Sequence, residues 1–161
     1  MRKFLFAVIA FVGVSTVGCD NYKAPESLRS EFSAQYPNAI DVEWERRRGH
    51  VVAEFELPGV SDDCEAWYTK SGKWLMTEFK IQYSELPQAV RTSFESSYGS
   101  QTPVDDVSRV VFYNNPTIYF IEATIVVNGF LTDIYLDYNE AGELLRTAVD
   151  VENYDNIYYY L

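Results

Sequence analysis

The stretch PESLRSEFSAQYP, residues 25–37, decides the fold because a related stretch, PQAVRTSFESSYG, follows at residues 87–99. The apolar positions of the two stretches lie 62 residues apart and match in pairs: Leu28 with Val90, Phe32 with Phe94, and Tyr36 with Tyr98. Their four-residue spacing places them on one helical face, and the leading prolines suit the first turn of a helix. A repeated unit buries its apolar face against its copy, so the duplication predicts one domain built from two halves.

A second set of matches follows at a larger offset and with a different period. Here residues match others 70 positions later: Val51 with Ile121, Ala53 with Ala123, Phe55 with Ile125, Leu57 with Val127, Tyr68 with Tyr138, and Gly72 with Gly142. Alternation of apolar and polar residues is typical of half-buried antiparallel strands. The eight extra residues of the second half are expected between its helix and its second strand.

Turn signals divide each half into one helix and four strands. We expect strands at residues 41–48, 50–57, 63–70, 73–81, 106–113, 117–127, 130–138 and 143–150. Asn128-Gly129 is the sharpest turn signal, because this pair favours a two-residue type I′ hairpin. The chain is therefore predicted to be an α+β protein of two tandem α-β-β-β-β repeats, residues 25–81 and 86–150. The repeats are expected to share a single hydrophobic interior.

The first 18 residues have the features of an export signal of the lipoprotein type. Arg2 and Lys3 provide positive charge, and residues 4–14 form an apolar stretch too short to cross a bilayer. Gly18 and Cys19 then resemble the bacterial lipobox, in which the cysteine is diacylated and anchors the protein to a membrane. Thr16 stands where the lipobox has Leu or Val, so ordinary secretory cleavage near Gly18 is the alternative.

The remaining segments follow from these boundaries. Residues 19–24 are predicted to be a tether, residues 25–150 the domain, and residues 151–161 a tyrosine-rich tail. Cys64 matches Ile134 at the offset of 70 and is predicted to be a buried strand residue, because free buried cysteine behaves as a small hydrophobe. A disulfide with Cys19 is expected only if lipidation fails.

The charge of the chain excludes one class of partner. It carries 13 basic and 24 acidic residues, and losing Arg2 and Lys3 with the signal brings the net charge to 11 minus 24, or about −13. Such a chain repels phosphate backbones, so we expect no nucleic acid. A cationic partner protein, peptide or metal is permitted, although an acidic net charge more often reflects solubility.

Strand alternation assigns the two faces of the predicted sheet. Towards the helices we expect Val51, Ala53, Phe55, Leu57, Cys64, Ala66, Tyr68, Leu75 and Phe79. The opposite face combines acids with large apolar side chains, and its candidate partner-binding residues are Glu54, Glu65, Trp67, Trp74, Met76, Phe120, Glu122 and Tyr135. Exposed aromatic patches mark interaction sites, and tryptophan and tyrosine are frequent among binding hot spots. Ordinary packing of a pleated surface, or cover by the tail, is the alternative explanation.

No motif predicts catalysis, a cofactor or a metal. One histidine and two separated cysteines are too few for the common zinc sites, and no Gly-x-Ser-x-Gly elbow occurs. Residues 137–142 resemble a calcium loop only faintly, because Ala141 stands where an oxygen ligand is needed. We expect this segment to be a hairpin turn.

The repeated motifs resemble those of a known family of exported bacterial proteins. They read Pro25-x-x-Leu28-x-x-x-Phe32-x-x-x-Tyr36-Pro37 with Trp44 following, and Leu86-Pro87-x-x-Val90-x-x-x-Phe94-x-x-x-Tyr98. The pattern resembles the PepSY-like family, also described as beta-lactamase-inhibitor-like. The resemblance implies a continuous antiparallel sheet of about eight strands with both helices on one face. It also implies a small periplasmic or surface module that grips a partner with its concave sheet face, although no inhibitory residue carries over.

These observations lead to one expected function and two alternatives. We expect a non-enzymatic envelope module that binds a protein or peptide on the acidic and aromatic face and touches the membrane only through its lipid anchor. A small outer-membrane barrel is one alternative, although two helices interrupt the strands. A carbohydrate-active enzyme that uses Glu54 or Glu122 is the other.

Overall fold

The computed structural model describes residues 22–60, 63–149 and 160. The predicted export signal, Cys19 and nearly all of the predicted tail lie outside the described residues. The first repeat consists of α1 (Glu26–Gln35), β1 (Ile40–Arg47), β2 (His50–Glu56), β3 (Cys64–Tyr68) and β4 (Trp74–Lys80). After the 3₁₀ turn η1 (Tyr83–Glu85), the second consists of α2 (Gln88–Tyr98), β5 (Val104–Phe112), β6 (Ile118–Val127), β7 (Phe130–Asn139) and β8 (Leu144–Val149).

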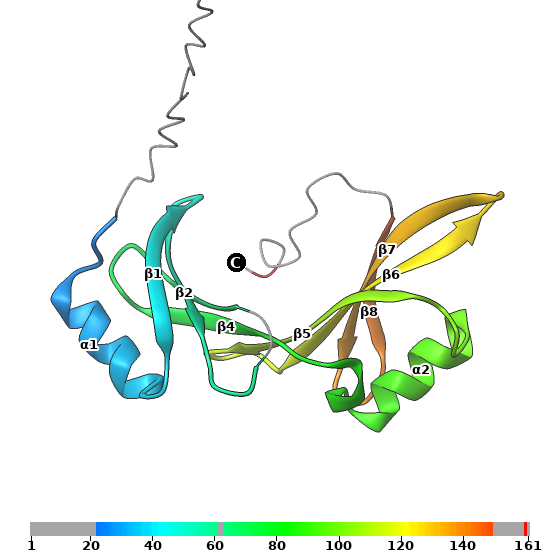
Figure 1. Ribbon diagram of the computed structural model, residues 1–161, viewed down its shortest axis with the longest axis horizontal. Coiled ribbons are helices and arrows are strands. Elements are labelled where there is room, and N and C mark those ends of the chain that lie inside the picture. The colour runs from blue at the N-terminus through cyan, green and yellow to red at the C-terminus, as the bar shows by residue number, and fades with distance from the viewer. Residues whose placement is uncertain (1–21, 61–62, 150–159, 161) are drawn as a thin grey trace, which may run out of the picture.

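All eight strands belong to one open sheet. Each strand pairs antiparallel with the next along the chain, in the order β1-β2-β3-β4-β5-β6-β7-β8, and the β4–β5 pair joins the two repeats. Both helices lie on the same side of the sheet (Figure 1). The predicted α+β fold of two α-β-β-β-β repeats is therefore confirmed. We call the side that carries the helices the helix face and the opposite side the far face.

Each helix begins directly after a proline and buries one narrow stripe. Pro25 and Pro87 have φ angles of −53° and −51°, the value that the proline ring imposes. The buried helix residues are Leu28 and Phe32 in α1, and Val90 and Phe94 in α2. These are the positions that matched at the offset of 62, so the helices are equivalent.

The apolar residues form three cores. Under α1 lie Val51, Ala53, Phe55, Cys64, Ala66 and Tyr68, and under α2 lie Val107, Tyr119, Ile121, Ala123, Ile134, Leu136 and Tyr138. The third core lies on the far face and consists of Val52, Trp67, Met76, Val110, Phe112, Ile118 and Phe120. The expectation of a single shared interior is wrong for the helix face, because each helix covers only its own repeat. The core that both repeats share is on the other side of the sheet.

The pairing register refines the alignment of the repeats. Val51 pairs with Tyr68, and Tyr119 pairs with Tyr138, so the offset is 68 residues between β2 and β6 but 70 between β3 and β7. The predicted match of Val51 with Ile121 is therefore displaced by two residues. A displacement of two leaves every side chain on the same face of a strand, which is why the assignment to faces survives.

A bulge repeated in both halves changes the faces of two residues. The register shifts between Trp67 and Tyr68 against β4, and at the equivalent place between Asp137 and Tyr138 against β8. Beyond the bulge Trp74 packs against the core under α1, whereas Leu75 packs against the far-face core. Both residues were predicted on the opposite faces, because a bulge inserts one residue and inverts the alternation.

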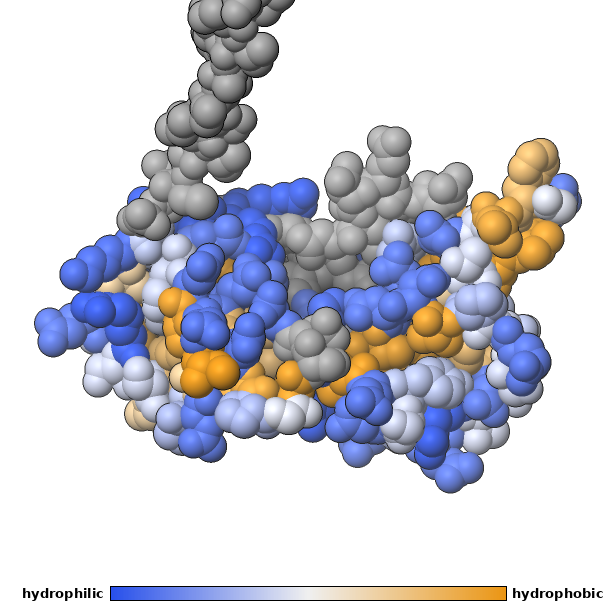
Figure 2. All heavy atoms as spheres, viewed as in Figure 1, coloured by the Kyte–Doolittle hydropathy of each residue, from blue (hydrophilic) through white to orange (hydrophobic). Residues whose placement is uncertain are grey.

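Two tight hairpins use consecutive residues with positive φ. Asn128 and Gly129 have φ angles of 52° and 85°, as the predicted type I′ turn requires. Arg48 and Gly49, with 46° and 90°, form the same kind of turn between β1 and β2, although arginine gave no signal for it. The β6–β7 hairpin extends beyond its neighbours, and its apolar tip protrudes at one end of the molecule (Figure 2). Its exposed large apolar residues are Val126, Val127, Phe130 and Leu131.

Cys64 is a buried core residue, as its match with Ile134 predicted. Its side chain is inaccessible in the core under α1, and burial raises the pKa of its thiol to about 11. The thiol is therefore protonated at neutral pH and a poor nucleophile. Among the described residues, no helix has the length and apolar character needed to cross a membrane.

Candidate functional site

Four glutamates form a continuous row across the far face of the first repeat. Strand pairing places Glu43 opposite Glu54, Glu54 opposite Glu65, and Glu65 opposite Glu78. We call these four residues the acidic row. Like charges directly opposite each other on neighbouring strands destabilise a sheet, so this arrangement opposes folding unless cations offset it.

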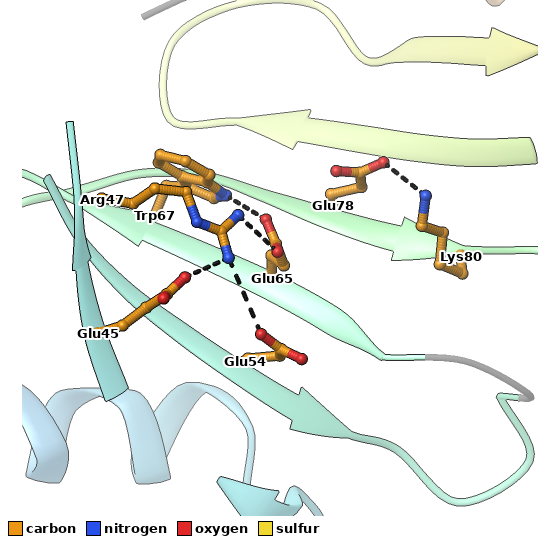
Figure 3. A network of polar contacts seen from close by, with 7 residues as sticks. All are labelled: Glu45, Arg47, Glu54, Glu65, Trp67, Glu78 and Lys80. Atoms are coloured by element: carbon orange, nitrogen blue, oxygen red, sulfur yellow. Dashed lines mark hydrogen bonds and ion pairs between the residues drawn. The ribbon is translucent and has the colours of Figure 1, made fainter. Parts of the chain in front are cut away.

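Arg47 gathers three carboxylates at one end of the acidic row (Figure 3). Its Nη1 donates to Oε1 of Glu65 at 2.8 Å, its Nη2 lies 3.9 Å from Oε2 of Glu54, and it also pairs with Glu45. Burial lowers the pKa of Arg47, but Glu65 and Glu45 outweigh it and leave the pKa above its usual value. Three acids around one guanidinium leave this corner with a net negative charge.

The indole of Trp67 completes this network. Nε1 of Trp67 donates to Oε2 of Glu65 at 3.0 Å, and the Arg47 guanidinium lies 5.2 Å from the centre of the Trp67 ring. Glu65 thus accepts from a cation on one oxygen and from an aromatic N–H on the other. We call Arg47, Glu65 and Trp67 the first triad.

Glu78 and Lys80 continue the polar surface towards the second repeat (Figure 3). Nζ of Lys80 lies 3.4 Å from Oε1 of Glu78 and pairs with Asp106 of β5. Burial raises the pKa of Glu78, and Lys80 and Ser108 act against that rise. Burial of Glu54, reinforced by the nearby Glu65, raises its pKa in the same way. Glu54 and Glu78 of the acidic row therefore bind protons more readily than free glutamate does.

The second repeat carries a related row with different chemistry. Asp106 lies opposite Glu122, Glu122 opposite Tyr135, and Tyr135 opposite Ala148. Burial raises the pKa of Glu122, while a hydrogen bond with Tyr135 lowers it. The neighbouring hydroxyl of Thr124 lies within hydrogen-bond distance of Asp105 and Asp133. Acidic side chains thus continue along the far face of both repeats.

Asp137 is the most deeply buried acid of the far face. Its carboxylate is inaccessible, and its Oδ2 accepts from Nε of Arg146 at 2.7 Å and from the hydroxyl of Tyr160 at 2.7 Å. The Tyr160 ring lies 5.7 Å from that of Phe112 and 6.0 Å from that of Phe120. We call Arg146, Asp137 and Tyr160 the second triad. Tyr160 lies outside the strands and rests on the far-face core.

The predicted site residues are only partly where the sequence placed them. Glu54, Glu65, Glu122 and Tyr135 are partly exposed on the far face. Trp67, Met76 and Phe120 also lie on that face but are buried in its core, at 0%, 0% and 5% exposure, so they do not form an open aromatic patch. Trp74 lies on the helix face, where its Nε1 donates to Thr77.

Several residues of the site were missed because their importance depends on strand register. Glu43 and Glu78 extend the row that Glu54 and Glu65 begin, and Arg47 and Asp137 organise the two triads. The available signal was the match of Trp67 with Asp137 at the offset of 70, which replaces a large aromatic by an acid.

The described far-face acids do not form a metal centre, and Glu54 and Glu122 lie too far apart to act as a glycosidase pair. Within the described ranges, no group of three or more His, Cys, Asp or Glu side chains could hold a metal ion. Glu54 on β2 and Glu122 on β6 are four strand spacings apart, roughly 19 Å along the sheet. Paired glycosidase carboxylates lie about 5 to 9.5 Å apart, so these two cannot act as such a pair.

Sequence comparison identifies the family. The family described as "Putative beta-lactamase-inhibitor-like, PepSY-like" matches residues 59–146, more than half of the chain. The chain belongs to this PepSY-like family. No curated protein matches the sequence.

Solved structures agree with this assignment. A BLIP-like protein from Bacteroides fragilis is 30% identical with a TM-score of 0.69, and the match covers 84% of this chain and 92% of that one. A DUF2874 family protein from Bacteroides uniformis is 25% identical with a TM-score of 0.72, covering 82% and 94%. A "putative periplasmic" protein from Bacteroides eggerthii is 25% identical with a TM-score of 0.74, covering 84% and 96%. Similarity to this last protein agrees with export to the periplasm.

Proposed function

We propose that this PepSY-like protein is a non-enzymatic module of the cell envelope that binds a basic protein or peptide segment on its far face. The acidic row carries the proposal. Four glutamates aligned on adjacent strands oppose folding, and Arg47 and Lys80 contact some of them in the two networks described above. A surface that holds such unfavourable charge is suited to a cationic ligand, whose charge would relieve the repulsion.

The position of the row supports binding of a macromolecule. The helices leave the far face uncovered, and the sheet bends so that its two ends rise on that side (Figure 1). The buried far-face core holds the row on rigid strands, which limits the entropy lost on binding. One relative is described as BLIP-like, which is consistent with an inhibitor-like role in binding.

The non-enzymatic part of the proposal rests on the chemistry of the site. The far-face carboxylates are engaged by Arg47, Lys80 and Arg146, and burial is the first cause of the raised pKa values of Glu54 and Glu78. Carboxylates held in this way are suited to recognising the positive charges of a ligand. We further propose that acylated Cys19 holds the protein at a membrane surface.

Charge reversal on matched faces tests the proposed function. The exported protein would be used as bait in an envelope extract, with Glu54→Lys as the far-face variant and Glu31→Lys on the exposed surface of α1 as the control. Both substitutions change the net charge by the same amount. Glu54→Lys is expected to reduce capture of a specific partner at least tenfold, and Glu31→Lys less than twofold. Equal effects of the two variants would contradict binding at the far face.

Salt dependence provides a second measurement. Binding of a cationic segment to partly exposed carboxylates weakens as salt screens the charges. The affinity of the captured partner is expected to fall between 50 and 300 mM NaCl for the wild type and to fall less steeply for Glu54→Lys. An affinity independent of salt would contradict recognition by the acidic row.

A further inference from the structure

We propose that Asp137, Arg146, Phe112 and Phe120 form a receptor for the phenol side chain of tyrosine. In this structure Tyr160 fills the receptor, and a tyrosine of a partner peptide takes the same place when Tyr160 leaves. This inference rests on the proposed function, because it assigns one contact that a partner segment makes on the far face.

The contacts of Tyr160 define the receptor. Its hydroxyl donates to Oδ2 of Asp137 at 2.7 Å, and its ring stacks on Phe120 with an interplanar angle of 26°. Phe112 lies against it at 55°, and the guanidinium of Arg146 is 5.8 Å from its centre. The site therefore contacts both the flat ring and the polar end of a phenol, which are the two features that distinguish tyrosine.

Comparison with the first triad shows why Tyr160 behaves as a ligand. In both triads an arginine and an aromatic hydrogen-bond donor share one carboxylate, and the arginine lies 5.2 Å from the Trp67 ring and 5.8 Å from the Tyr160 ring. Trp67 belongs to β3, so its aromatic group is a permanent part of the sheet. Tyr160 comes from beyond β8, so the second triad can lose its aromatic group while the sheet stays intact.

The buried charge pair gives the receptor its selectivity. At the positions equivalent to Trp67 and Met76 the second repeat has Asp137 and Arg146, an ion pair in place of an apolar pair. Burying an ion pair is unfavourable unless further hydrogen bonds satisfy it, and the Tyr160 hydroxyl supplies one. Oδ1 of Asp137 is buried and finds no hydrogen-bond partner among the described residues. A phenol fits this carboxylate, whereas the negative charge of phosphotyrosine is repelled by it.

A small phenol probe tests the receptor directly. N-acetyltyrosinamide would be titrated into the mature wild-type protein and its Tyr160→Gly variant, with chemical shifts followed by NMR. Tyr113→Gly is the matched control, because Tyr113 is an exposed tyrosine that packs on Trp74 away from the receptor. Tyr160→Gly is expected to bind the probe at least tenfold more tightly than the wild type or Tyr113→Gly does. The shift changes are expected at Phe112, Phe120 and Nε–H of Arg146.

Two comparisons identify the role of the hydroxyl. N-acetylphenylalaninamide is expected to bind Tyr160→Gly at least fivefold more weakly than N-acetyltyrosinamide, and O-phosphorylated N-acetyltyrosinamide is expected not to bind. Adding Asp137→Asn to Tyr160→Gly should remove the preference for tyrosine. If that double variant does not fold, the comparison of the probes on Tyr160→Gly alone decides. Equal binding of the tyrosine and phenylalanine probes, or of the tyrosine probe to wild type and Tyr160→Gly, would overturn the proposal.

The outcome can be separated from that of the proposed function. If capture of a partner depends on Glu54 but Tyr160→Gly binds no tyrosine probe, the receptor is wrong and the acidic row still binds the partner. If the probe binds but Glu54→Lys does not reduce capture of the partner, the receptor binds the phenol of Tyr160. In that case the proposal that a partner binds at the far face is wrong.

Discussion

The two repeats have the same fold but place different kinds of side chain at equivalent positions of the far face. In the first, Trp67 and Met76 lie side by side and an aromatic side chain is built into the sheet. In the second, Asp137 and Arg146 take these places and the aromatic group is Tyr160 from outside the sheet. Their neighbouring rows differ as well, since four glutamates in the first repeat correspond to Asp106, Glu122, Tyr135 and Ala148 in the second. The helix faces of the two repeats therefore carry similar side chains, whereas their far faces differ.

The largest expected effect distinguishes the two aromatic groups. Trp67 is fully buried, so Trp67→Ala is expected to lower the free energy of unfolding by about 3–5 kcal/mol through loss of packing. Tyr160 is partly exposed and outside the sheet, so Tyr160→Ala is expected to lower it by only about 2 kcal/mol, through loss of the hydrogen bond to the Asp137 carboxylate and of part of the ring packing. Urea denaturation of both variants measures the difference. Equal losses would show that Tyr160 is as integral to the fold as Trp67.

The next comparison concerns the turn glycines that matched at the offset of 70. A Cβ at Gly142 would lie 2.4 Å from the carbonyl oxygen of Ala89 in α2, whereas at Gly72 the nearest atom is Cδ1 of Leu28 at 3.9 Å. Both glycines have positive φ, at 80° and 90°. Gly72→Ala is therefore expected to lower the free energy of unfolding by about 1 kcal/mol, and Gly142→Ala by about 3 kcal/mol because a clash is added.

Chemical denaturation of the two alanine variants tests this difference. If Gly142→Ala is no more destabilised than Gly72→Ala, then α2 does not approach its turn more closely than α1 does.

A smaller effect is expected for the buried ion pair of the second repeat. Asp137→Leu leaves the guanidinium of Arg146 without its carboxylate and is expected to cost about 2 kcal/mol, less than for a fully buried pair because Arg146 is partly exposed. The double variant Asp137→Leu with Arg146→Met restores an apolar pair like that of the first repeat. It is expected to lie within about 1 kcal/mol of the wild type, because both charges are removed.

Thermal denaturation of the single and double variants measures the coupling between the two positions. A double variant as unstable as Asp137→Leu would show that the two repeats are not interchangeable at this place.

The smallest effect is a pH dependence from Glu78 of the first repeat, whose counterpart in the second repeat is Ala148. Burial raises the pKa of Glu78 above 4.5, so between pH 4.5 and that raised pKa the folded state holds more protons than the unfolded state. Stability from this group therefore falls as pH rises through that range. Glu78→Gln is expected to be more stable than the wild type at pH 8 by about 1 kcal/mol and to show no such gain at pH 4.

Glu31→Gln on the exposed surface of α1 is the control for this measurement. A gain for Glu78→Gln that is the same at pH 4 and pH 8 would contradict the role of burial.

The fold could be predicted because its helices and strands follow from patterns among neighbouring residues in the sequence. The helices were placed to within a residue or two because Pro25 and Pro87 set their starts and the four-residue spacing set their buried stripe. Cys64 was assigned correctly to the core because alternation along β3 does not depend on what the strand pairs with. Trp74 was misplaced because the bulge beside it is a property of the β3–β4 pair and not of either strand alone.

The candidate site was less predictable because it depends on neighbours. Glu54 and Glu65 could be assigned to the correct face, but their alignment with Glu43 and Glu78 required the register of three strand pairs. Trp67 was expected to be exposed on a wet surface. It is buried because residues of β4 and β6 complete a third core around it, which alternation within one strand cannot show.

By itself, the sequence determined the duplication, the order of helices and strands, and the side of the sheet on which most residues lie, since periodicity acts over a few neighbouring residues. The tertiary structure decided which acids form a row, which aromatics are buried and where Tyr160 rests. Those features arise from contacts between residues distant in the chain, whose register and burial depend on how whole strands pair.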